Sequence, residues 1–82
     1  MARVLFFGRL RDIAGQSEIQ IGRAVSTIAQ LREVLGADNP MLAEALAAPG
    51  IRVAIDQRMA IGADAPIGGA KEIAFMSPLS GG

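Results

Sequence analysis

The chain has 82 residues, with eight basic and eight acidic side chains, so its formal net charge is zero. Its length suits a single domain, and its apolar content of 51% is enough for one packed core, which excludes a disordered segment. The balanced charge argues against a general nucleic-acid binder, and no apolar run approaches the ~20 residues of a membrane span.

The chain contains neither cysteine nor histidine. Their absence excludes disulfides, thiol and imidazole catalysis and most zinc chemistry. The start of the sequence lacks the apolar region and the cleavage site of a signal peptide. We therefore expect a soluble, cytoplasmic protein that holds no metal or cofactor and is no enzyme on its own.

The first predicted element is a strand over residues 2–7, because an apolar run rich in strand formers ends at Gly8. Residues 9–15 mix polar and apolar types and close on a glycine, which predicts a loop with a helical turn. Residues 18–21 alternate polar and apolar side chains, which predicts a half-buried strand that pairs with the first as a hairpin.

A helix is predicted next, over about residues 27–35. Thr27 and Gln30 have the spacing of a capping box, which marks a helix start. Apolar residues then recur at helical spacing, at Ile28, Leu31, Val34 and Leu35. We expect Gly36 to end this helix in a left-handed conformation.

The second half of the chain predicts a shorter helix and then three strands. Residues 40–47 are typical of the helix, since Pro40 suits a first helical turn. The remaining predictions are a strand over 51–55, a turn at Asp56-Gln57, a short strand or sheet edge over 58–61 and a last strand over 72–76.

This order of elements predicts an α+β domain of the ubiquitin-like β-grasp arrangement, a mixed sheet with one main helix packed across it. We expect the domain to span residues 1–76 and a flexible C-terminal Gly-Gly tail to span residues 77–82. The first and last strands are the most apolar, so we expect them side by side and parallel at the centre of the sheet.

The period of two along the central strands divides their side chains between two faces. On the first strand, Val4 and Phe6 share one face, and the residues that follow each of them share the other. One face has to meet the helix, and the other then exposes an apolar patch, which usually marks a partner surface. The expected patch is Leu5, Phe7, Ala74 and Met76. The alternative is that both faces are covered.

The tail ends in Gly81-Gly82. With ten glycines in the chain, such an end arises by chance at a rate of roughly 1.5%, and a frayed terminus is the plain alternative. The tail of six residues spans at most about 20 Å, and two residues without Cβ fit a confined active site on another protein. If the Gly82 carboxylate is activated as a mixed anhydride with AMP, attack by sulfide or persulfide gives a thiocarboxylate. A chain without cysteine can carry sulfur in this way.

Two blocks of the sequence, "VLFFGRLRD" from Val4 and "EIAFMSPLSGG" from Glu72, resemble the small subunit of molybdopterin synthase, the MoaD-type sulfur carriers. The likeness runs the full length of the chain with little insertion. The chain departs from the family at Asp56, where an asparagine is usual, and at Met76 and Ser77, where an aromatic residue and a proline are common.

The resemblance implies a mechanism. A ubiquitin-activating-like, ATP-dependent adenylyltransferase adenylates Gly82, and a sulfur donor protein converts it to the thiocarboxylate. The tail then enters the large subunit of the synthase, a heterotetrameric transferase, and sulfur passes to cyclic pyranopterin monophosphate in molybdenum cofactor biosynthesis. Phe7 and Met76 match family positions on the docking face. The resemblance assigns Pro78, Leu79 and Ser80 to the tail that enters the partner.

Three alternatives stay open. The chain could be a sulfur carrier of another pathway, such as the thiazole branch of thiamin synthesis, although those chains are usually shorter and lack much of the 37–50 segment. It could be a ubiquitin-like modifier that is conjugated to lysines. It could also be a binding domain whose Gly-Gly end has no chemistry.

Overall fold

The computed structural model of the chain describes residues 2–22, 24–60 and 65–77. Its elements are β1 (Ala2–Phe7), α1 (Arg9–Ala14), β2 (Glu18–Ile21), α2 (Ile28–Ala37), α3 (Pro40–Leu46), β3 (Arg52–Ile55), β4 (Arg58–Met59) and β5 (Glu72–Met76). The strands form one sheet in the order β2-β1-β5-β3-β4. β1 and β5 are parallel, and the other neighbours are antiparallel. The predicted hairpin, crossover helix and central parallel pair are all confirmed.

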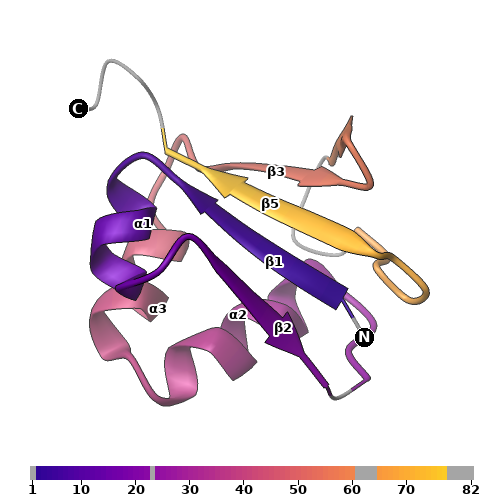
Figure 1. Ribbon diagram of the computed structural model, residues 1–82, viewed down its shortest axis with the longest axis horizontal. Helices are drawn as coiled ribbons and strands as arrows, with labels where there is room; N and C mark the ends of the chain where they lie inside the picture. The colour runs from indigo at the N-terminus through magenta and orange to yellow at the C-terminus, as the bar shows by residue number, and fades with distance from the viewer. Residues whose placement is uncertain (1, 23, 61–64, 78–82) are drawn as a thin grey trace.

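The helices cover one face of the sheet. In the view of Figure 1, α2 and α3 lie below the strands, and no helix among the described residues lies above them. Phe6 and Phe75 are register partners on the covered face, with ring centroids 6.1 Å apart. The side chains that fill the core and are at most 2% exposed are Val4, Phe6, Leu10, Ile28, Leu31, Leu46, Ile73 and Phe75. The predicted helix-facing side of both central strands is therefore confirmed.

The start of α2 follows the predicted capping pattern. The Thr27 hydroxyl oxygen accepts a hydrogen bond from the Gln30 backbone N–H at 3.2 Å. The Gln30 side-chain oxygen accepts one from the Ser26 backbone N–H at 2.7 Å, one residue earlier than in a standard capping box. The first bond satisfies a backbone donor that the first helical turn leaves unpaired, and the second ties the residue before the cap to the helix.

The predicted end of this helix is wrong. α2 continues through Gly36 to Ala37, and Gly36 does not adopt a positive φ. The reason for a glycine here is the neighbouring helix, since a Cβ built on Gly36 would overlap the Cβ of Ala43 in α3. The glycine therefore allows two short helices to approach closely, which the sequence pattern of α2 alone does not reveal.

Two other segments differ in extent from the prediction. The predicted loop over 9–15 is largely the helix α1, which Gly15 ends at a φ of 81°. β4 is shorter than the predicted edge over 58–61, because it ends at Met59. Ile61 lies outside the described residues.

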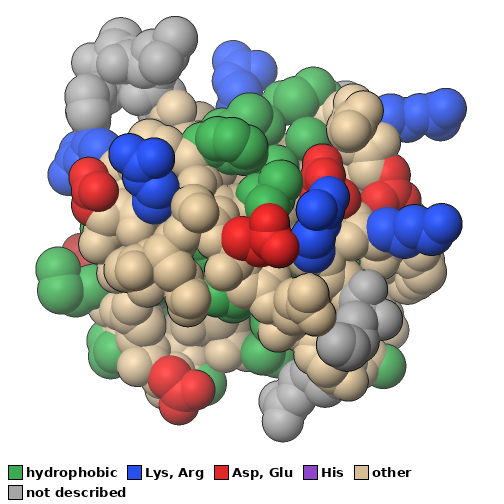
Figure 2. All heavy atoms as spheres, viewed as in Figure 1, with side chains coloured by type: hydrophobic (Ala, Val, Ile, Leu, Met, Phe, Trp, Pro, Cys, Tyr) green, Lys and Arg blue, Asp and Glu red, His purple; other side chains and the backbone are tan. Residues whose placement is uncertain are grey.

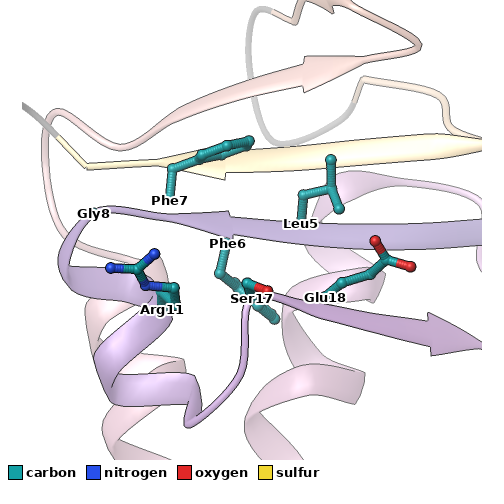
Figure 3. A pocket seen from close by; sticks show the side chains of 7 residues that line it. All are labelled: Leu5, Phe6, Phe7, Gly8, Arg11, Ser17 and Glu18. Atoms are coloured by element: carbon teal, nitrogen blue, oxygen red, sulfur yellow. The ribbon is translucent and has the colours of Figure 1, made fainter.

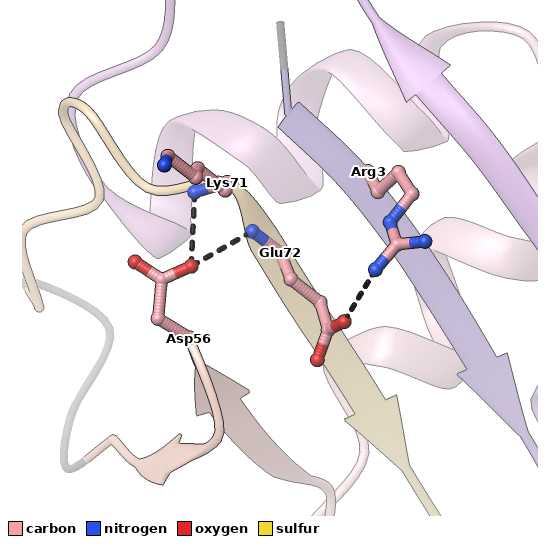
Figure 4. Close-up of polar contacts among 4 residues, drawn as sticks. All are labelled: Arg3, Asp56, Lys71 and Glu72. Atoms are coloured by element: carbon pink, nitrogen blue, oxygen red, sulfur yellow. Dashed lines mark hydrogen bonds and ion pairs between the residues drawn. The ribbon is translucent and has the colours of Figure 1, made fainter.

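The turn at Asp56-Gln57 fixes the start of β5. Both residues have a positive φ, 49° and 71°, which is typical of a two-residue type I′ hairpin turn. One Asp56 carboxylate oxygen accepts hydrogen bonds from the backbone N–H groups of Lys71 and Glu72, each at 2.9 Å (Figure 4). The turn between β3 and β4 thus holds the first residues of the strand that leads to the tail.

Candidate functional site

The root of the tail lies beside the end of β1. Because β1 and β5 are parallel, both end at the same edge of the sheet, and Phe7 is the register partner of Met76. Ser77, the first residue of the predicted tail and the last one described, lies next to Gly8, since a Cβ built on Gly8 would come within 2.7 Å of the Ser77 Oγ. The structure therefore brings the two predicted docking residues together at this edge.

Gly8 is needed here for two reasons. Its φ of 63° and ψ of −136° belong to a region that residues with a side chain rarely occupy. This conformation turns the chain sharply from β1 into α1. A Cβ at this position would also force the Ser77 side chain to move, so the glycine allows the root of the tail to lie close to β1.

The rest of the tail lies outside the described residues. β5 ends at Met76, so the predicted division of the chain at residues 76 and 77 coincides with the end of the last strand. The predicted roles of the tail residues stay predictions: Pro78, Leu79, Ser80, Gly81 and Gly82.

The face of the sheet that no helix covers carries two apolar rows. Register places Phe7 beside Met76, and Leu5 beside Ala74, in successive rows across β1 and β5. We define the apolar face as Leu5, Phe7, Ala54, Met59, Ala74 and Met76. Phe7 is 49% exposed and Met59 is 55% exposed. Figure 2 shows hydrophobic side chains gathered over the central strands of this face, with charged side chains around them.

Three of the four residues of the predicted exposed patch are at least partly exposed, and the fourth, Ala74, is buried. Phe7 is exposed, and Leu5 and Met76 are partly exposed. Ala74 is only 6% exposed, because its small side chain lies between its register partners Leu5 and Ala54. The sequence reasoning missed Ala54 and Met59, which are directly opposite one another on β3 and β4. The polar–apolar alternation over 51–55 indicates which residues of that strand share a face with Ala54. Only the sheet order shows that this strand lies beside β5.

A shallow hollow of about 270 Å³ opens next to the tail root (Figure 3). Leu5 and Phe7 rise from β1 on its open side, while Phe6 points the opposite way into the core. Arg11 of α1 and Glu18 at the start of β2 stand at its border. The hollow therefore offers an apolar wall with a cation and an anion beside it, which suits a side chain of a partner protein.

Charged groups border the apolar face both at the end far from the tail and beside the tail root. Arg3 and Glu72 are register partners two residues before Leu5 and Ala74, and their side chains form an ion pair with N···O 2.8 Å (Figure 4). Arg52 lies in the same row as Phe7 and Met76 and is exposed. The apolar face is thus bordered by charge, as protein interfaces commonly are.

The described residues do not form a metal site or a buried polar cluster. Within it, no polar or charged side chain is classed as buried, and no group of three or more acidic, histidine or cysteine residues is placed to hold a metal ion. None of the helices in residues 2–22, 24–60 and 65–77 is long and apolar enough to cross a membrane. What these residues do present is a surface at the root of the tail.

Comparison with known proteins agrees with this geometry. The molybdopterin synthase sulfur carrier subunit of Escherichia coli (strain K12) is 29% identical over 82 residues, which is the full length of both chains. The solution structure of small archaeal modifier protein 1 from Methanosarcina acetivorans matches with a TM-score of 0.82 at 20% identity, covering 99% of this chain and 95% of that one.

Two further solved structures share the fold. The crystal structure of the corresponding modifier from Haloferax volcanii has a TM-score of 0.77 at 22% identity, over 99% of this chain and 98% of that one. A putative molybdopterin converting factor subunit 1 from Pyrococcus furiosus has a TM-score of 0.68 at 19% identity, over 95% and 97%. The resemblance seen in the sequence is confirmed. The model of the ThiS family matches residues 4–82, and the chain therefore belongs to the ThiS family.

Proposed function

We propose that the chain is the sulfur carrier subunit of a molybdopterin synthase. The observation that carries the proposal is that the apolar face and the root of the tail lie at the same edge of the sheet. A partner that docks on this face receives the tail directly. The full-length similarity to the E. coli subunit supports the choice of pathway.

The proposed chemistry takes place at the carboxylate of Gly82. An activating adenylyltransferase transfers AMP from ATP to this carboxylate and releases pyrophosphate. Hydrosulfide delivered by a donor protein then attacks the carbonyl carbon, displaces AMP and leaves a thiocarboxylate without any change of oxidation state. In the synthase, the sulfur is transferred to cyclic pyranopterin monophosphate, and water restores the carboxylate. The chain supplies sulfur and a docking surface, while catalytic side chains come from its partners.

Different parts of the proposed docking surface would contact different parts of the partner. Phe7 and Met76 lie closest to the tail and would form the apolar centre of the interface with the large subunit. The hollow beside them, with Arg11 and Glu18, would receive a partner side chain. Pro78, Leu79 and Ser80 would line the channel through which the glycines reach the partner's active site. The proposed setting is the cytoplasm, where the activating enzyme and the synthase meet their carrier.

The test is deletion of Gly82 from the protein in its native cell. We expect molybdoenzyme activity to be lost. Intact mass should show a fraction of the unaltered protein, and none of the variant, heavier by the replacement of oxygen with sulfur. A matched control is Gly22→Ala, because a Cβ there meets nothing within 4 Å and the tail is intact. Normal molybdoenzyme activity in the deletion strain would refute the proposal.

A ubiquitin-like modifier is the second candidate, since two of the similar structures are archaeal modifier proteins. Their identities of 20% and 22% support the shared fold, so they do not choose between the two functions. The same cells distinguish them. A modifier would give larger species in which the C-terminal carboxyl is joined to a lysine, and these conjugates would disappear when Gly82 is deleted. A carrier of the thiamin pathway would instead make the deletion strain dependent on added thiazole.

A further inference from the structure

β2 lies at a free edge of the sheet (Figure 1), and a groove lies between this strand and α2. It consists of two neighbouring hollows of about 370 Å³ and 570 Å³. Both are lined by Ile21, Val34 and Asp38, so they are continuous. We call this feature the β2–α2 groove. It opens on the helix side of the sheet, away from the apolar face.

The backbone of β2 is available for pairing along this edge. β2 is the outermost strand of the sheet and pairs with β1 alone. The Phe6 N–H donates to the Ser17 carbonyl at 2.9 Å, which makes this a hydrogen-bonded pair of an antiparallel ladder. Hydrogen-bonded and non-hydrogen-bonded pairs alternate, so Glu18 and Gln20 direct their N–H and C=O groups away from β1. An added strand could bond to both residues.

The lining of the groove shows what such a strand would carry. The smaller hollow has a mainly apolar lining, with Ile21 and Leu35 buried and Val34 partly exposed, whereas the larger hollow exposes mostly polar surface. Among the residues that the structure describes, Asp38 is the only charged one that lines either hollow, and its side chain is exposed. The Asn39 amide is already engaged, because it donates to the Ile13 carbonyl and accepts from the Leu42 N–H. The smaller hollow therefore favours apolar side chains, and the larger hollow favours a basic side chain beside Asp38.

We infer that the β2–α2 groove binds an extended segment of a partner protein, which adds to β2 as a sixth strand. Alternate apolar side chains of the segment fill the smaller hollow, and a lysine or arginine on the same face lies over the larger hollow and pairs with Asp38. Main-chain hydrogen bonds to Glu18 and Gln20 supply affinity, and the hollows supply sequence preference. This site goes beyond the proposed function, because it allows a protein to hold the carrier while the apolar face and tail stay free.

The experiment uses the full chain, labelled with ¹⁵N, and a blocked peptide of sequence Thr-Val-Thr-Val-Thr-Lys. We expect the peptide to shift the backbone amide signals of Glu18, Gln20, Val34 and Asp38 and to leave those of Leu5 and Phe7 unchanged. A peptide with N-methylated backbone on its bonding edge is the control and should shift none of them. Shifts confined to the apolar face, or no shifts at millimolar peptide, would overturn the inference.

A second experiment reverses the charge at position 38. Asp38→Lys should weaken binding of the lysine peptide by about two- to fivefold and strengthen binding of the matching glutamate peptide by a similar factor. The substitution places a cation at the end of α2, which a helix C-terminus favours, so the fold should persist. Equal affinities of the two peptides for both proteins would overturn the inference. So would a doubled mass of the free chain in solution with the same amides shifted, because a second copy would then occupy the groove.

Discussion

The two faces of the sheet differ most sharply at Phe6 and Phe7. These neighbours have the same side chain on the same strand, yet Phe6 is 2% exposed and Phe7 is 49% exposed. The pleat alone separates them, since successive side chains on a strand point to opposite faces. The covered face stabilises the domain, and the open face is free to bind. Residue type therefore does not reveal the role of an apolar residue here, whereas its position in the strand does.

Truncation of the two phenylalanines should give the largest contrast. Phe6→Ala removes a ring that stacks on Phe75 in the core, and we expect it to lower the free energy of unfolding by about 3–5 kcal/mol. Phe7→Ala should change it by less than about 0.5 kcal/mol, as is usual for exposed positions. Chemical denaturation of both variants measures the difference. Comparable losses in the two variants would show that something covers Phe7 in solution.

The open face can be tested for binding with a charged substitution. We expect Phe7→Asp to weaken binding to the synthase large subunit by at least about tenfold, because it places a carboxylate at the apolar centre of the proposed interface. Calorimetric titration with the purified large subunit measures this. Met41→Asp is the control, since Met41 is 71% exposed on α3, away from this face. Equal effects of the two substitutions would place the interface elsewhere.

The difference between the faces was predictable from the sequence because alternation is a local property. The limits of β1, β2 and β5, the pairing of β1 with β5 and the exposed position of Phe7 followed from the order and pattern of apolar residues. The contribution of Met59 did not, because it depends on β4 lying beside β3 and on β3 lying beside β5. Sheet order is a long-range property that one strand does not encode.

Glycines illustrate the same limit. The pattern around Gly36 indicated a helix end, whereas the structure uses this glycine for contact between α2 and α3. Gly8 was expected only to end a strand, yet it also accommodates Ser77, 69 positions later in the sequence. In both cases the missing information is the identity of a distant neighbour. The proposed carrier tail is a different case, since Gly81 and Gly82 can be read directly from the sequence.

The contact at Gly8 predicts a smaller effect that extends to the tail root. We expect Gly8→Ala to destabilise the domain by about 1–3 kcal/mol through backbone strain and to shift the amide signal of Ser77. Gly15→Ala is the control, because Gly15 also has a positive φ, 81°, but a Cβ built there meets nothing within 4 Å. It should be destabilising by about 1–2 kcal/mol without a change at Ser77. If both variants leave the Ser77 signal unchanged, the contact does not position the tail root.

The ion pair on the open face should have the smallest effect. Arg3 and Glu72 lie 2.8 Å apart, but the Arg3 side chain is 50% exposed, so water and salt screen their attraction. A double-mutant cycle with Arg3→Gln and Glu72→Gln should give a coupling of about 0.2–1 kcal/mol at low salt that declines in high salt. A coupling above about 2 kcal/mol would mean that the open face also stabilises the domain. A small coupling would instead confine stability to the helix-covered face and leave the open face free to be shaped by its partners.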